Sequence, residues 1–67
     1  MGNLNKNFIN INADDLEVNV FIQNLIDTVA KIREKQIQNG VVDNKIMIYS
    51  SNNSKELTLQ YYDYNNN

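Results

Sequence analysis

Apolar residues in the middle of the chain repeat with a helical period. They fall at alternating spacings of four and three residues, which is the pattern of one face of an amphipathic helix. The stripe consists of Val18, Ile22, Leu25, Val29 and Ile32. Phe21 lies beside it, and Ile26, Ala30 and Ile37 widen one flank. No Gly or Pro interrupts this stretch, so the pattern predicts a helix over residues 13–38.

Both ends of this predicted helix carry recognisable signals. Asn12 is a suitable N-cap, and Asp14 and Asp15 would lie in the first turn, where the helix dipole favours carboxylates. Alternatively, Asp14 caps the helix and Glu17 completes a capping box. At the other end, Gly40 can adopt the left-handed conformation that terminates a helix. Basic residues precede it, namely Lys31, Arg33 and Lys35. They do not share one helical face, so we interpret them as a solvated last turn.

After Gly40 the period changes from 3.6 to 2. The segment KIMIYSSNNSKELTLQYYDY predicts a β-hairpin that turns around Asn52 and Asn53. A loop of even length pairs residues whose numbers have an odd sum, such as 105, which would place Ile48 opposite Leu57 and Ile46 opposite Leu59. Tyr61 continues this apolar face. The other face would carry Lys45, Met47, Tyr49, Thr58, Gln60, Tyr62 and Tyr64.

The opening segment, NLNKNFININ, has asparagine at every second or third position. Residues 8–11 have the alternation of a short strand, with Ile9 and Ile11 on one side and Phe8 on the other. Three strands are much more stable than an isolated hairpin, so we expect this segment to join the sheet. Residues 1–6 are expected to form a flexible tail, residues 7–64 a single domain, and residues 65–67 a second tail. The fold class is therefore α+β, with one long helix on a small antiparallel sheet in the order β-α-β-β.

A mismatch in length leads to a prediction about assembly. A helix of 26 residues would be about 39 Å long, whereas a strand of five or six residues spans about 17–20 Å. We therefore expect a second copy to cover the remaining apolar surface, and we predict a homodimer. The residues expected at the dimer interface are Leu25, Val29, Ile32 and Ile37.

Size and composition limit the chemistry. The chain has 67 residues, no Cys and no His, so it offers neither a disulfide nor the usual zinc ligands. The net charge of −2 gives no basic footprint for duplex nucleic acid. No apolar run is long enough to span a membrane, and we find no leader peptide, so we expect a cytoplasmic protein.

Asparagine is abundant, with 14 residues of 67. Together with Ile, Lys, Tyr and Phe, whose codons are A/T-rich, it accounts for 33 residues. We interpret this bias as the product of an A/T-rich genome, such as that of a low-GC bacterium or its phages and mobile elements.

Catalysis and metal binding are not expected. The segment NADDLE clusters three carboxylates, but helix capping explains them better than a cation site, since no calcium-loop pattern accompanies them. No Gly-rich phosphate loop or nucleophile elbow is present. We therefore predict no enzymatic activity, no cofactor and no metal.

The aromatic side chains of the predicted sheet suggest a binding surface. Aromatic residues and Met are enriched where proteins meet, and those expected on the open face are Phe8, Met47, Tyr49, Tyr62 and Tyr64. We therefore predict a protein-binding module, acting as an inhibitor, adaptor or regulator, whose partners are a second copy of itself and an unidentified protein. One alternative is single-stranded nucleic acid stacked on the same tyrosines near Lys45 and Lys55. Another is a structural subunit of a larger assembly.

Overall fold

The protein folds as one helix packed on a three-stranded antiparallel sheet. The computed structural model describes residues 3–13, 17–51 and 55–64. Its elements are β1 (Leu4–Asn12), α1 (Val18–Gln38), β2 (Ile46–Ser50) and β3 (Glu56–Tyr64). The predicted α+β class and the order β-α-β-β are confirmed for these residues.

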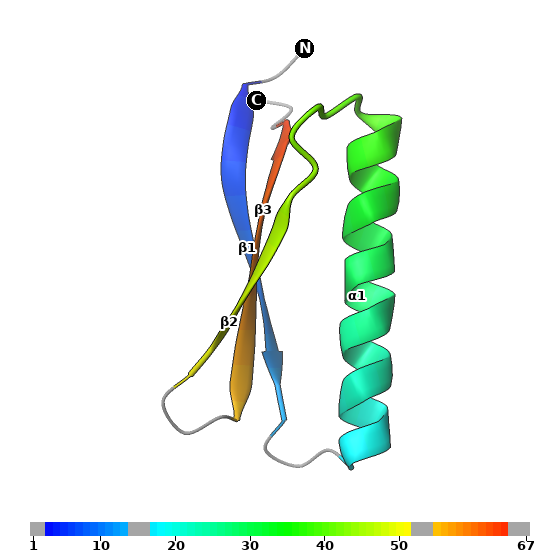
Figure 1. The fold of residues 1–67 in the computed structure, drawn as a ribbon, viewed down its shortest axis with the longest axis vertical. Helices are drawn as coiled ribbons and strands as arrows, with labels where there is room; N and C mark the ends of the chain where they lie inside the picture. Colours follow the sequence, from blue (N-terminus) through cyan, green and yellow to red (C-terminus); the bar gives the residue numbers. More distant parts are fainter. Residues whose placement is uncertain (1–2, 14–16, 52–54, 65–67) are drawn as a thin grey trace.

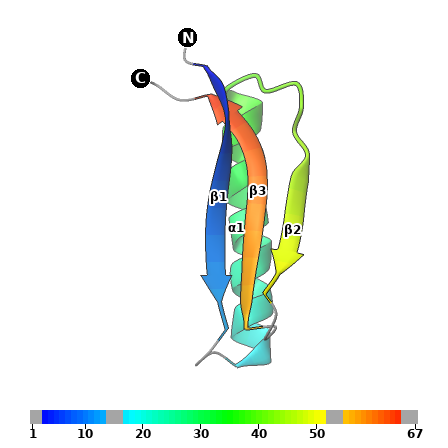
Figure 2. The same cartoon turned by 90° about the vertical axis from the view of Figure 1, so that its left-hand side faces the viewer.

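The last strand in the sequence is the central strand of the sheet. The strand order is β1-β3-β2, and β3 pairs antiparallel with both neighbours. Helix α1 runs along one face of the sheet and leaves the opposite face uncovered (Figure 1). Viewed from the sheet side, α1 lies behind β1 and β3, and β2 forms one edge (Figure 2).

The core lies between α1 and the sheet. Its buried members are Ile11, Ile32, Leu59 and Tyr61. Partly buried apolar side chains pack around them, namely Ile9, Phe21, Leu25, Val29, Ile46 and Leu57. The alternation predicted for the strands therefore places Ile9, Ile11, Ile46, Leu57 and Leu59 toward the helix, as expected.

The hairpin register differs from the expected one by two residues. Ile48 lies opposite Leu59 and Ile46 lies opposite Tyr61, so the paired numbers have the sum 107 rather than 105. Because side chains alternate with a period of two, a shift of two residues leaves every residue on its predicted face. The predicted turn residues Asn52 and Asn53 lie outside the described residues.

Strand β1 begins earlier than expected. We predicted a tail up to residue 6, but Leu4, Asn5 and Lys6 pair with Tyr64, Asp63 and Tyr62. The nine-residue β3 supplies a partner along this whole length. The asparagines also stabilise the strand locally, since Asn5 Nδ2 donates to the Asn3 carbonyl over 2.7 Å and Asn7 Nδ2 to the Asn5 carbonyl over 3.1 Å.

Helix α1 begins later than expected, so both predicted starts are wrong. Ala13 is still in the sheet ladder, because its N–H donates to the Lys55 carbonyl over 2.7 Å. Glu17 is extended, with φ −61° and ψ 152°, and makes no side-chain capping bond. It therefore precedes the helix and does not complete a capping box. The Asp14 and Asp15 side chains lie outside the described residues.

The C-terminal end of α1 is as predicted. Gly40 has φ +69°, and its N–H donates to the Ile37 carbonyl over 3.2 Å. The N–H of Val41 donates to the Gln36 carbonyl over 3.0 Å. These two bonds form a Schellman motif, which satisfies carbonyls of the last helical turn and reverses the chain toward β2.

The mismatch in length that led us to expect a dimer is not present. The 21 residues of α1 span about 31 Å, and the nine residues of β1 or β3 span about 30 Å. Ile32 is only 2% exposed within the single chain, and Leu25 and Val29 pack against the same core. These three residues therefore face their own sheet, whereas Ile37 is 70% exposed. The oligomeric state stays a prediction.

Candidate functional site

The face of the sheet opposite α1 carries a row of large apolar side chains. Register pairing places Phe8 on β1 and Met47 on β2 on either side of Gln60 on β3. Tyr49 is the next residue of β2 on this face, opposite Thr58. Phe8, Tyr49 and Met47 are 59%, 45% and 39% exposed. We call this surface the open face; its further members are Leu4, Lys6, Asn10, Asn12, Glu56, Tyr62 and Tyr64.

Polar contacts hold several side chains of the open face in place. The Met47 sulfur accepts from the Tyr49 hydroxyl at 3.5 Å and from Gln60 Nε2 at 3.8 Å. Thr58 Oγ1 donates to Asn10 Oδ1 over 2.8 Å. The aromatic and sulfur groups therefore lie on an ordered sheet, which reduces the entropy lost when a partner binds.

The charge on the open face is small and mixed. Lys6 lies opposite Tyr62 at one end of the face, and Glu56 lies at the other end opposite Asn12. Among the described strand residues, the middle of the face, around Phe8, Met47 and Tyr49, holds no charge. This surface suits an apolar contact with a polar rim.

The five residues predicted to bind a partner, Phe8, Met47, Tyr49, Tyr62 and Tyr64, all belong to this face by their register. Their role in binding stays a prediction. Among the four predicted dimer residues, three face the core as described above.

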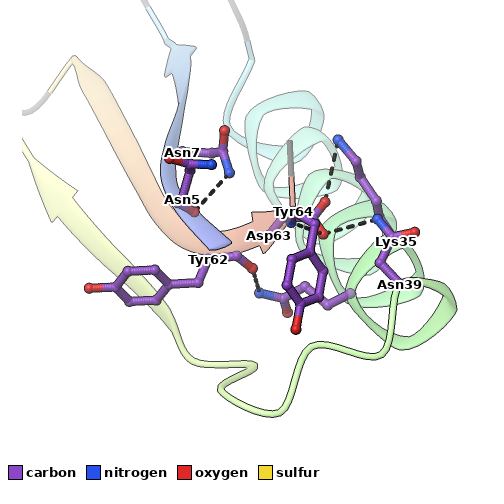
Figure 3. Close-up of polar contacts among 8 residues, drawn as sticks. Asn5, Asn7, Lys35, Asn39, Tyr62, Asp63 and Tyr64 are labelled. Atoms are coloured by element: carbon purple, nitrogen blue, oxygen red, sulfur yellow. Dashed lines mark hydrogen bonds and ion pairs between the residues drawn. The ribbon is translucent and has the colours of Figure 1, made fainter. Parts of the chain in front are cut away.

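A second cluster, polar and centred on a buried carboxylate, connects the C-terminal end of α1 to β3. The Asp63 carboxylate is almost fully buried, and its Oδ1 accepts from Asn39 Nδ2 at 3.0 Å and from the Tyr64 N–H at 2.8 Å. Its Oδ2 lies 3.5 Å from Lys35 Nζ. Figure 3 shows Lys35 and Asn39 reaching the carboxylate from the helix.

The pKa of Asp63 is the net result of opposing effects. Burial acts to raise it, whereas the hydrogen bonds from Asn39 and the Tyr64 N–H and the charge of Lys35 lower it. The lowering effects prevail, so the pKa of Asp63 lies below its ordinary value of 3.8. At neutral pH this group is therefore a buried carboxylate.

Gln36 is also fully buried, and its side chain takes the place of a main-chain hydrogen bond between β2 and β3. Tyr62 would pair with Lys45, but β2 begins only at Ile46 and the Lys45 N–H donates to Asp43 Oδ1 instead. The Tyr62 carbonyl accepts from Gln36 Nε2 at 2.8 Å (Figure 3). The Gln36 side chain thus supplies the hydrogen-bond donor that β2 would have supplied to the Tyr62 carbonyl if it began one residue earlier.

Sequence reasoning missed this buried cluster. The signal was present, because Gln36 follows Ile32 by four residues and Asp63 follows Tyr61 by two. Both polar residues thus occupy core-facing positions. Their contacts fit a structural link between the layers.

The described residues show no metal centre and no membrane segment. Within residues 3–13, 17–51 and 55–64, no three His, Cys, Asp or Glu side chains gather to hold a metal ion. The Asp14 and Asp15 carboxylates lie outside these ranges. Helix α1 has no apolar stretch of the length needed to cross a membrane.

Comparison of the chain with known protein families, with curated proteins and with solved structures found no match.

Proposed function

We propose that this protein is a non-enzymatic binding module whose open face docks onto a partner protein, as an inhibitor, adaptor or regulator would. The observation that carries the proposal is the exposure of Phe8, Met47 and Tyr49 on one uncovered sheet face. Burying apolar surface is the main driving force of association, and aromatic residues and Met are enriched in interface cores.

The placement of these residues supports binding rather than folding. Phe8, Met47 and Tyr49 point away from α1, so they contribute nothing to the interlayer core. Their partners on β3, Thr58 and Gln60, are polar and uncharged, as is Asn10 beside Phe8, and Lys6 lies on the other side of Phe8 toward the end of the face. A contact centred on Met47 would therefore bury apolar groups without burying an unpaired charge, which would cost several kcal/mol.

The test compares two truncations with nearly equal exposure on opposite surfaces. Tyr49→Ala removes a 45% exposed ring from the open face, and Val20→Ala removes a 43% exposed side chain from α1. Proteins of the native host are captured on the immobilised wild-type chain and on each variant.

We expect a partner that binds wild type and Val20→Ala equally and binds Tyr49→Ala about tenfold more weakly, the effect of truncating an interface hot spot. Equal binding to all three, or weakening by Val20→Ala alone, would contradict the proposal.

One observation favours a second candidate, a single-stranded nucleic acid. Lys6 lies opposite Tyr62 on the open face, so a cation stands beside a ring that could stack a base. Titration with oligothymidine would then quench tyrosine fluorescence, and the affinity would fall steeply as salt rises. An unchanged fluorescence at low salt would eliminate this candidate and leave the protein-binding proposal standing.

A further inference from the structure

Strand β2 presents an unpaired edge beside exposed apolar groups. In the sheet order it has a neighbour on one side only, and its sequence, IMIYS, contains no charge. Natural edge strands are commonly protected from pairing by charged residues or proline. Ile48 faces the helix layer, opposite the fully buried Leu59, yet it is 50% exposed.

The flank of α1 nearest β2 is also apolar. Arg33 Nη1 donates to the Asn44 carbonyl, in the connection that leads into β2, so this flank faces the β2 side. Ile22 and Ile26 precede Arg33 by eleven and seven residues, which places both within about 20° of it around the helix axis. They are 47% and 55% exposed. We call Ile22, Ile26 and Ile48 the β2-side patch.

The shape of the molecule leaves this patch open. Strand β2 lies close to α1 at the end where it begins and diverges from it toward Ser50 (Figure 1). The helix packs on β1 and β3. Ile48 therefore lies on the face that α1 covers elsewhere in the sheet, but beyond the reach of the helix.

Hydrogen bonding fixes the direction of the main-chain groups of β2. The Ser51 N–H donates to the carbonyl of Glu56, its partner in the hairpin register. In an antiparallel ladder, alternate residues direct both polar groups to the same neighbour. The main-chain N–H and C=O groups of residues 47, 49 and 51 therefore point toward β3. Those of Ile46, Ile48 and Ser50 point away from β3, to the unpaired edge.

We infer that a second copy of this chain docks on β2, so that two sheets join into one of six strands with the β2-side patches of both copies in contact. Ile48 is the central residue of β2. A two-fold axis at Ile48 therefore pairs it with its own copy and pairs Ile46 with Ser50 of the copy. The main-chain groups of all these residues point to the unpaired edge. Each donor on one copy therefore meets an acceptor on the other, so the edge is self-complementary, as a two-fold interface requires.

Charge favours this edge over that of β1. On the flank of α1 away from Arg33, Lys35 reaches Asp63, and Lys31 lies one turn before it. Two copies meeting there would bring lysines together, whereas the cation on the β2 flank, Arg33, already donates to the Asn44 carbonyl. The small core adds a reason for assembly, since chains of this size bury too little surface to be very stable alone. This interface uses the helix side of the sheet edge and does not depend on the open face.

The test measures the mass in solution of the full chain and three variants by light scattering, with circular dichroism to verify folding. Ile48→Lys and Ile26→Lys place a charge in the patch from two different elements. Val20→Lys is the control, because Val20 is 43% exposed and lies about 140° from Arg33 around the helix axis.

We expect wild type and Val20→Lys to have twice the chain mass of 7.8 kDa, and the two patch variants to have 7.8 kDa. A monomeric wild type, a larger oligomer, or folded patch variants that stay dimeric would overturn the inference.

Hydrogen exchange of the backbone amides of the wild-type chain tests the same inference without any variant. The amides of Ile46, Ile48 and Ser50 should become protected as concentration rises. The Ala13 N–H donates to the Lys55 carbonyl, so the main-chain groups of odd-numbered residues of β1 point toward β3. The amides of Phe8 and Asn10 therefore point away from β3, to the other edge of the sheet. They should stay unprotected. Rapid exchange at Ile48 at all concentrations would overturn the inference.

Discussion

At the scale of single residues, the least expected feature is a buried carboxylate near the C-terminal end of a helix. The helix dipole disfavours negative charge there. Asp63 is stabilised by hydrogen bonds from Asn39 and the Tyr64 N–H and by the charge of Lys35. Periodicity places Gln36 and Asp63 at core-facing positions, but it could not give their partners, which come from the end of α1 and from a carbonyl that β2 is too short to reach.

The lowered pKa of Asp63 makes stability depend on pH. Because its folded pKa lies below the unfolded value of 3.8, its contribution is present above pH 3.8 and is lost as pH falls through the folded pKa. In Asp63→Asn we expect lower stability at pH 7 and a shallower loss on acidification. Urea unfolding at several pH values measures both. Parallel pH profiles for wild type and variant would show that Asp63 does not contribute in this way.

The hydrogen bond from Gln36 to the Tyr62 carbonyl can be tested separately. Gln36→Leu keeps the bulk of the side chain but leaves a buried carbonyl without its donor, which should cost about 1–3 kcal/mol of unfolding free energy. Gln38→Leu is the control, since Gln38 is exposed and its side chain donates to Glu34 on the same helix. Chemical denaturation measures both variants. If Gln36→Leu is as stable as wild type, the bond to Tyr62 is not needed for folding.

At the scale of elements, periodicity predicted types and faces better than boundaries. The alternation in IMIYS and ELTLQYYDY placed the apolar and aromatic side chains on their correct faces, even though the expected register was displaced by two residues. The start of the helix was misplaced because Asn12 and its acidic neighbours resemble a cap. A longer-range contact, the bond from the Ala13 N–H to the Lys55 carbonyl, keeps the chain extended there.

The left-handed backbone conformation of Gly40 leads to a prediction about the stability of the C-terminal end of α1. An added methyl group would meet no atom within 4 Å, so the only cost of Gly40→Ala is the backbone conformation. That cost should be about 1–2 kcal/mol. Gly40→Asn should cost less, because asparagine tolerates this conformation better. Thermal unfolding of the two variants gives the comparison. Equal melting temperatures for Gly40→Ala and wild type would exclude a strained backbone at this position.

At the scale of the whole molecule, the sheet has one face covered by α1 and one face open. The nine-residue strands match the helix in length, and this removes the reason for which we first expected a helix-to-helix dimer. Sequence reasoning underestimated β1 because its polar asparagines resemble a tail. The extent of β3, which pairs with all of it, could not be read from β1 itself. Two groups of exposed apolar side chains form surfaces, the open face and the β2-side patch, whereas Val18, Val20, Ile37 and Val42 belong to neither.

The most direct test of the proposed function places a photo-crosslinking phenylalanine analogue at Phe8 on the open face or at Val20 on α1. Each version is irradiated inside the native host, and the covalent products are separated by mass. The account predicts a discrete adduct with another protein from position 8 and none from position 20. No adduct from position 8, or an equally strong adduct from position 20, would contradict it.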